Sequence, residues 1–222
     1  MKKLVLLPLA LVFATNAAIA ANSVDLRVTG TITPSACDIS LTGGDFDLGT
    51  ISGNELNATA ATTLPSSAGK TLNITCSGAT QVAFRAIDNR ASSVPSGITQ
   101  NAASAFGLGM DGANNPIGHY NIAVLQPTAT VNGAAGQYKA SDDAGSTWFG
   151  FGGSEVNLSS SDRSSRIGTL DLASSGPTSQ PVPITSASTE LKVTAMIQPE
   201  SALDTSTEIT LDGSATIELV YL

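Results

Sequence analysis

Few side chains in this sequence could carry out acid–base or metal chemistry. His119 is the only histidine, so a Ser–His–Asp triad or a histidine-centred metal site would depend on that residue alone. Asp111 and the adjacent Asp142 and Asp143 do not fit the D-x-[DN]-x-[DN]-G spacing of a calcium loop. Capping of turns explains these aspartates more simply. We therefore expect no enzymatic activity, no metal site and no cofactor.

Residues 141–148 read S-D-D-A-G-S-T-W and match the S-x-D-x-G-x-T-W box that recurs in sialidases and other β-propellers. The box predicts a hairpin turn in which a carboxylate accepts backbone hydrogen bonds, a glycine adopts positive φ and a tryptophan covers the turn. A propeller would repeat the box in every blade, whereas it occurs once here. The box positions are Ser141, Asp143, Gly145, Thr147 and Trp148. Replacing Asp143 is expected to loosen the hairpin and to leave any assembly intact.

The amino terminus predicts export. Lys2 and Lys3 precede an apolar stretch, and Ala18-Ile19-Ala20 precedes Ala21, which is typical of a signal peptide over residues 1–20. In the oxidising periplasm the two cysteines, Cys37 and Cys76, are expected to form a disulfide. Its loop of about 40 residues would stabilise the fold by roughly 4 kcal/mol. We expect the two Cα atoms on neighbouring strands, roughly 4.4–6.8 Å apart.

The composition predicts an all-β protein. The 222 residues include 21 glycines and 10 prolines, and short alternating runs at 72–76, 82–86, 120–124 and 191–197 are typical of strands in a β-sandwich. The net charge of −8 argues against binding to nucleic acid or anionic lipid. Beyond the signal peptide no segment is long and apolar enough to predict stable membrane insertion. Charged residues make up only 13 %, which favours assembly with other chains.

These elements must be organised around two segments near the ends of the sequence. Residues 209–222 alternate as a half-buried strand does, and only Val220 breaks the alternation. The apolar row comprises Ile209, Leu211, Gly213, Ala215, Ile217, Leu219 and Tyr221. A second alternating row lies near the amino terminus and comprises Val24, Leu26, Val28, Gly30 and Ile32. Because an unpaired strand leaves backbone groups without partners, each segment requires a neighbouring strand.

Together, these features resemble the pilin subunits of chaperone–usher fimbriae. The matching features are the V-T-G-T-I run, the cysteine soon after it, the second cysteine, and the terminal alternating strand with penultimate Tyr221. More narrowly, the sequence looks like a fimbrial-like Gram-negative family catalogued as a domain of unknown function. One departure is that pilins usually carry a glycine fourteen residues from the end, where this sequence has Ile209 and the nearest glycine is Gly213.

The resemblance implies an incomplete immunoglobulin-like β-sandwich over residues 34–222, preceded by a donor-strand extension over residues 21–33. A periplasmic chaperone would fill a groove beside residues 209–221 and hold the Leu222 carboxylate, and another subunit's donor strand would replace the chaperone. An outer-membrane usher and other fimbrial subunits would be the remaining partners. The chain would pass through the periplasm and end in a fimbrium on the cell surface. Whether the donor strand acts in trans or completes its own fold is left open.

Two other functions fit parts of the sequence. A tip adhesin or lectin would place a glycan site in the loops of residues 88–188, with Trp148, Tyr120 and Tyr138 as the available stacking residues, although core packing is the commoner role of such aromatics. A glycosidase would rest on the single Asp-box alone. We expect a structural fimbrial subunit in preference to either.

Overall fold

The computed structural model describes residues 25–31, 36–99, 101–160, 166–172 and 180–222, and Ser35–Leu222 form one compact unit. The described residues of this unit form strands and four short 3₁₀ turns, at Gly53–Glu55, Ala91–Ser93, Ala102–Ser104 and Glu200–Ala202. The strands are β1 (Cys37–Thr42), β2 (Thr62–Thr63), β3 (Lys70–Thr80), β4 (Val82–Asp88), β5 (Phe106–Gly107), β6 (Gly118–Val131), β7 (Ala134–Ser141), β8 (Phe149–Gly150), β9 (Glu155–Asn157), β10 (Ile167–Leu172), β11 (Ile184–Ile197) and β12 (Ala215–Tyr221). The protein is therefore all-β, as predicted.

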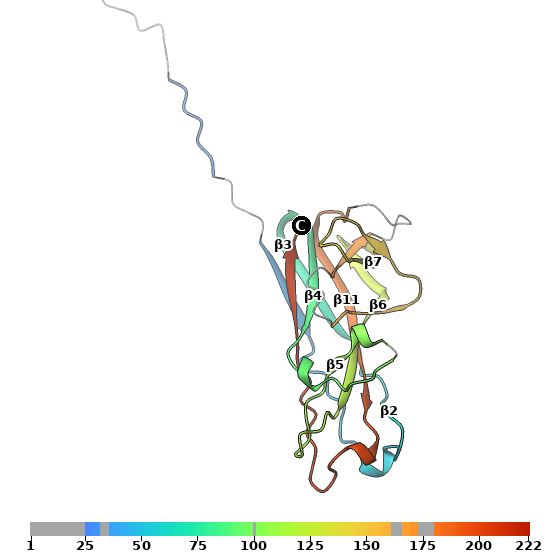
Figure 1. Ribbon diagram of the computed structural model, residues 1–222. Coiled ribbons are helices and arrows are strands. Elements are labelled where there is room, and N and C mark those ends of the chain that lie inside the picture. The colour runs from blue at the N-terminus through green and yellow to red at the C-terminus, as the bar shows by residue number, and fades with distance from the viewer. Residues whose placement is uncertain (1–24, 32–35, 100, 161–165, 173–179) are drawn as a thin grey trace, which may run out of the picture. The chain divides into compact units, whose positions relative to one another are not determined.

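The alternating runs form the long strands. On β11, every second residue from Leu191 to Ile197 is buried, and the residues between them are partly exposed. Leu72, Ile74 and Cys76 form the corresponding buried row on β3. Such period-2 burial arises because successive side chains of a strand point to opposite faces. In Figure 1, β3, β11 and β6, which are neighbours in the strand order, run along the compact unit.

The strands follow one antiparallel path, in the order β1-β3-β11-β6-β7-β10-β4-β12. The path bends at the β6–β7 hairpin, so that β1, β3, β11 and β6 face β7, β10, β4 and β12. The first group corresponds in order to strands A, B, E and D of an immunoglobulin sandwich, and β4 and β12 correspond to C and F. Among the described residues, no strand lies beyond β12 in the position of strand G.

The main apolar core lies between the two groups of strands. It includes Phe84, Val124, Leu170 and Leu191, each at most 1 % exposed. A second, smaller cluster of Ala83, Trp148 and Ile167 lies on the other face of the β4 group, and Val220 packs against it. Val220 therefore breaks the alternation of the terminal segment because it contributes to this second cluster.

The disulfide prediction is confirmed. Cys37 and Cys76 lie directly opposite each other on β1 and β3 and are bonded. Their Cα atoms are 3.9 Å apart, below the expected range. The Cys37 N–H donates to Tyr221 Oη at 2.9 Å and not to β3, which places the two cysteines in a non-hydrogen-bonded pair, the closer of the two types of antiparallel pair.

The terminal strand is shorter than the sequence predicted. Regular pairing with β4 covers Ala215–Tyr221, and residues 209–214 have no strand structure. Residues 209–214 do not continue the pairing with β4 because they are bonded elsewhere: the Asp212 N–H donates to Leu108 O at 2.9 Å. Gly213 also passes so close to Tyr120 that an added Cβ would lie 2.8 Å from its ring. Residues 209–214 are thus drawn toward the loop after β5.

A buried ion pair lies between β7 and β10. Lys139 Nζ is 2.7 Å from Asp171 Oδ2, and the two side chains are 0 % and 3 % exposed. The other carboxylate oxygen, Asp171 Oδ1, accepts hydrogen bonds from the backbone N–H groups of Leu172 and Val182. Both oxygens of the buried carboxylate are therefore used.

The predicted extension is described only in part. Residues 25–31 have no regular secondary structure, and Leu26 and Val28 are 89 % and 87 % exposed. The predicted signal peptide, Val24 and Ile32 lie outside the described residues. No helix in the part of the chain that the structure describes has the length and apolarity needed to cross a membrane.

Candidate functional site: a groove between β1 and β12

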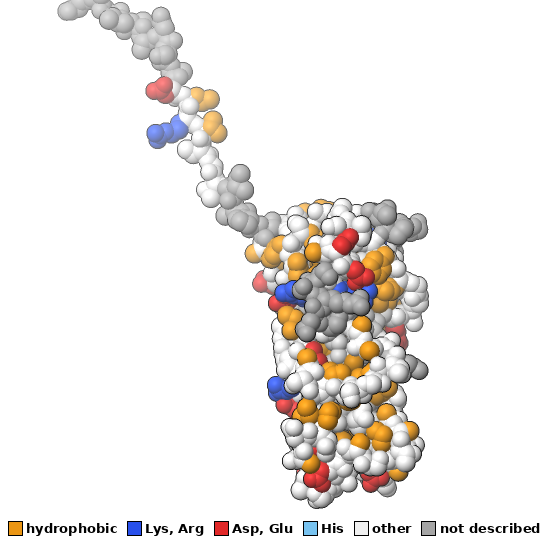
Figure 2. All heavy atoms as spheres, in the orientation of Figure 1, with side chains coloured by type: hydrophobic (Ala, Val, Ile, Leu, Met, Phe, Trp, Pro, Cys, Tyr) orange, Lys and Arg blue, Asp and Glu red, His pale blue; other side chains and the backbone are white. Residues whose placement is uncertain are grey.

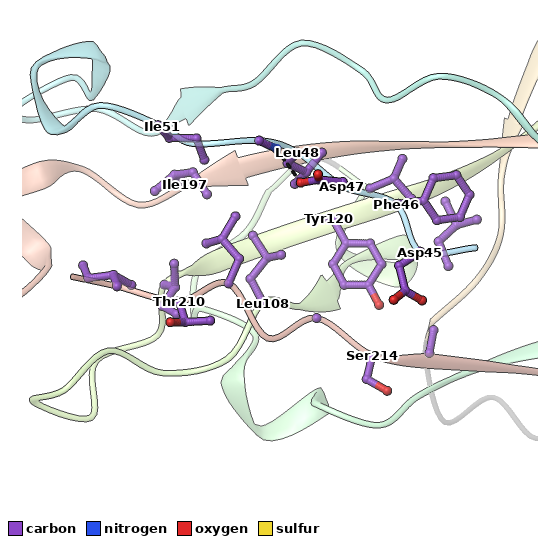
Figure 3. Close-up of a pocket in the computed structure, with 18 of the residues that line it drawn as sticks. Asp45, Phe46, Asp47, Leu48, Ile51, Leu108, Tyr120, Ile197, Thr210 and Ser214 are labelled. Atoms are coloured by element: carbon purple, nitrogen blue, oxygen red, sulfur yellow. Dashed lines mark hydrogen bonds between the residues drawn. The ribbon is translucent and has the colours of Figure 1, made fainter. Parts of the chain in front are cut away.

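A long groove of 1090 Å³ follows the gap between the two ends of the strand path. One wall is formed by β1 and the segment after it, and the other by residues 203–217. In Figure 3, Tyr120 and Leu108 point into the space between the segment that carries Asp45 to Ile51 and the segment that carries Thr210 and Ser214. The groove is thus located where the sandwich is open.

The floor of the groove is the main core itself. Leu72, Ile122, Leu191 and Val193 belong to the core and also line the groove. On the walls, Ile39, Phe46, Leu211 and Ile217 are only partly buried although they pack against the core. Each half-exposed apolar side chain leaves favourable burial unrealised, at about 25 cal/mol per Å² of apolar surface. The groove is therefore suited to an apolar occupant.

Both walls carry strand edges. β1 pairs with β3 and β12 pairs with β4, and within the described residues neither has a strand on its other side. An edge of this kind presents backbone N–H and C=O groups that can pair with an added strand. An occupant in extended conformation could bond to both edges and also fill the apolar floor.

Beyond the residues that line the groove, a hydrogen bond joins the two strands that form its walls. Tyr221, the penultimate residue, accepts the Cys37 N–H bond described above, which joins the beginning of β1 to the end of β12. Because Cys37 is also bonded to Cys76, the disulfide holds this N–H in place. The Tyr221 side chain is 53 % exposed and accessible to an incoming chain.

The beginning of the second wall is held by Asp111. Its Oδ2 accepts hydrogen bonds from the Asp204 N–H and from Asn115 Nδ2, and its Oδ1 accepts from the backbone N–H groups of Ala113 and Asn115. These hydrogen bonds, that of Asp204 foremost, lower the pKa of Asp111 to about 2. The aspartate caps its own turn and ties it to the segment that begins the second wall at Leu203.

Tyr120 forms the centre of the floor. Its ring stacks on Phe106 with the centroids 5.3 Å apart, and Gly213 crosses its edge. Burial raises the pKa of the Tyr120 hydroxyl. The close approach at Gly213 requires a residue without a side chain, while Ile209, at the position of the usual pilin glycine, lines the groove.

The predicted groove residues divide into two sets. Ile209, Leu211, Gly213, Ala215 and Ile217 line the groove. The other three lie elsewhere: Leu219 packs against the main core, Tyr221 bonds to Cys37, and the Leu222 side chain lies beside Gly145.

The first wall was missed by the sequence reasoning. Phe46, Leu48 and Ile51 line the groove from the segment after β1. Their apolar spacing gave a signal of burial, but nothing in it indicated that this segment would face residues 203–217. Asp45, Asp47 and Glu208 supply the charge in the lining, and no described lining residue is basic.

The Asp-box forms the turn between β7 and β8. Asp143 Oδ1 accepts hydrogen bonds from the Thr147 N–H and the Ser141 hydroxyl, and Oδ2 accepts from Thr147 Oγ1. These bonds lower the pKa of Asp143 to about 2, the backbone bond of Thr147 contributing most. Gly145 has φ +95°, and Trp148, 1 % exposed, donates from Nε1 to Gly145 O.

His119 lies on β6 and is 5 % exposed. Neither ring nitrogen has a hydrogen-bond partner among the described residues. Burial lowers its pKa below the ordinary value of 6.5. In the described part of the chain, no three histidine, cysteine, aspartate or glutamate side chains are grouped so that they could hold a metal ion.

Comparisons with known proteins give two similarities. Residues 26–118 match a family described as "Protein of unknown function (DUF1120)", a region that runs from the exposed amino-terminal segment to the start of β6. The chain is also similar to Protein GltF of Escherichia coli (strain K12), with 28 % identity over 253 aligned positions that cover 96 % of this chain and 94 % of GltF. Neither description names an activity.

Proposed function

We propose that this protein is a structural subunit of a chaperone–usher fimbria that polymerises by donor-strand exchange and contributes to cell adhesion. The observation that carries the proposal is the groove between β1 and β12, where the core is open and two strand edges face each other. This is the position that strand G fills in a complete immunoglobulin sandwich.

The proposed occupant is residues 24–32 of another subunit. Nine residues in extended conformation span about 30 Å, and backbone bonds to β1 and β12 would complete the sandwich. Its even-numbered side chains would enter the groove, with Gly30 at a point too shallow for a side chain. Burial of the four others at ~1.5–3 kcal/mol each would contribute roughly 6–12 kcal/mol. The exposed Leu26 and Val28 are then apolar because they are buried in the fibre.

Before assembly, the periplasmic chaperone would occupy the same groove and bind the Leu222 carboxylate. The outer-membrane usher would then allow the donor strand of the next subunit to replace the chaperone. This sequence of events requires export, which the predicted signal peptide at residues 1–20 would provide.

Adhesin and glycosidase functions have less support. Trp148, Tyr138 and Tyr120 are between 1 % and 7 % exposed, which leaves their rings little surface for stacking on a sugar. The Asp143 carboxylate is engaged in hydrogen bonds within its own turn. Both features favour structural roles for these residues.

The test of this proposal is assembly of the mature chain in the presence of its chaperone and usher. We expect ladders that resist SDS and collapse on heating. Gly30→Leu should block exchange, because the added side chain has no space in the groove. Thr29→Ser is the matched control and should assemble normally, since position 29 points away from the groove. Normal ladders from Gly30→Leu would contradict the proposal.

A deletion distinguishes exchange in trans from completion of the same chain. A chain that lacks residues 21–33 keeps its own groove but has no donor strand. With the chaperone present it should fold, and its addition to a growing assembly should stop elongation. Continued polymerisation of the deleted chain would exclude these residues as the donor, and unfolding despite the chaperone would indicate self-completion.

A further inference from the structure

The Asp-box turn lies directly beside the end of β12. A Cβ added to Gly145 would be 3.2 Å from Leu222 Cδ2, within contact distance of the last side chain of the chain. Trp148 of the same turn belongs to the second apolar cluster, against which Val220 packs. Leu222 therefore lies against the turn, and Val220 packs against the cluster to which the turn contributes Trp148.

β12 consequently has two different faces. Ala215 and Ile217 line the groove, and Leu219 packs against the main core. Val220 and Leu222 contact the cluster and the turn on the opposite side. β12 is therefore positioned by its pairing with β4 and by these contacts on the face turned away from the groove.

The support is a rigid one. Asp143 connects the beginning and the end of the turn through Ser141 and Thr147, and the Trp148 indole is fixed by its bond to Gly145 O at 3.0 Å. In addition, the Leu222 N–H donates to Gln81 O at 3.1 Å, which extends the pairing with the β4 side beyond Tyr221. A turn with this many internal bonds can hold the tryptophan and Gly145 in one arrangement.

We propose that the Asp-box turn is a mount for the carboxy-terminal strand, and that Asp143 is the positioning residue that fixes this wall of the groove. This inference rests on the proposed function where it concerns strand uptake, but not where it concerns the position of β12. It replaces the expectation from sequence that Asp143 affects only its own hairpin. The box would here serve assembly and not sugar hydrolysis.

The first measurement is hydrogen exchange on the full mature chain. In Asp143→Ala, the amides of Val220 and Leu222, which point toward the β4 side, should exchange about tenfold faster, because the lost bonds release the turn. Amides of β1 and β3 should keep their rates. Asp142→Ala is the matched control: it removes the neighbouring carboxylate, which bonds to Arg166 outside the box, and should leave the exchange of the Val220 and Leu222 amides unchanged.

The second measurement is uptake of a fluorescent peptide with the sequence of residues 24–32 by the same full-length variants. Asp143→Ala should slow uptake about fivefold relative to Asp142→Ala, as expected when a binding wall loses its support. If Asp143→Ala does not fold, Thr147→Val removes only the Oγ1 bond to Asp143 and should produce a smaller change in the same direction.

The outcomes separate the two ideas. Unchanged exchange rates of the terminal amides in both Asp143→Ala and Thr147→Val would contradict the proposal that the Asp-box turn is a mount for β12. Faster terminal exchange with no effect on uptake would overturn the positioning role of Asp143 at the groove. If the wild-type chain takes up no peptide while the terminal amides respond as expected, the mount stands and the proposed function fails.

Discussion

The β7–β10 side of the sandwich and the gap between β1 and β12 differ in which side chains are buried. On the β7–β10 side, charged Lys139 and Asp171 are almost completely buried, and both carboxylate oxygens have partners. At the gap, apolar residues such as Ile217 and Leu211 remain partly exposed beside strands that, within the described part of the chain, pair on one edge only. Residue polarity therefore does not distinguish the closed side of the sandwich from the open one. The closed side is the one where the strands and the buried polar groups have their partners.

The largest effect on stability is expected at the buried ion pair between β7 and β10. Lys139→Ala should lower the free energy of unfolding by about 3–5 kcal/mol, because it leaves the Asp171 carboxylate buried without its cation. Chemical denaturation measures this loss. The matched control is Lys192→Ala, which breaks the more exposed pair with Glu155 and should cost less than about 1 kcal/mol. Equal losses in the two variants would show that the buried pair contributes no more to stability than the exposed one.

A smaller and different effect is expected at the gap. Ile217→Ala should weaken uptake of the peptide of residues 24–32 about tenfold, because the wall loses apolar surface that the occupant would cover. Its cost to the stability of the unoccupied chain should be only about 1 kcal/mol, since Ile217 is partly exposed. Thr216→Ala, on the exposed opposite face, is the control. A large loss of stability with unchanged uptake would identify Ile217 as an ordinary core residue.

The smallest effect concerns His119, whose lowered pKa makes stability depend on pH. Below the ordinary pKa of 6.5 the unfolded chain binds a proton that the folded chain does not. Stability should therefore be full above pH 6.5 and should fall as the pH decreases toward the lowered pKa of the folded state. Denaturation at pH 7 and pH 5 should show this loss, and His119→Phe should reduce it. An unchanged difference between the two pH values in His119→Phe would exclude His119 as its source.

The aspartates provide an internal reference for that measurement. Asp111 and Asp143 have pKa values of about 2 in the folded chain, below the ordinary pKa of an aspartate. Their carboxylates therefore stabilise the folded chain at every pH above that ordinary pKa. Their contribution is lost only as the pH falls toward 2. The histidine and aspartate effects therefore occupy separate ranges of pH.

The sequence predicted the elements that obey a local rule. Alternation predicted β3, β11 and the carboxy-terminal half of the second groove wall, and the disulfide was inferred from the prediction of export. The beginning of β12 was predicted too early, because its limit is set by the contact of Gly213 with Tyr120, ninety-three positions away in the chain. Alternation cannot report a contact of that kind.

Two other features were out of reach for related reasons. The burial of Lys139 depends on Asp171, which comes from a different strand, so neither residue alone predicts it. Residues 43–51 carry an apolar pattern but no indication of the wall that they face. The sequence showed that Val220 breaks the apolar alternation. Only the structure shows that it packs against the cluster that contains Trp148.

The hydrogen bond between Cys37 and Tyr221 joins residues 184 positions apart. This separation affects when the groove can form during folding. Contacts between distant parts of a chain are slow to form because the intervening loop must close first. The two walls come from opposite ends of the folded unit, so no stretch of the chain that emerges early can present the groove. A ligand of the groove would therefore recognise only chains whose synthesis and folding have reached the last strand.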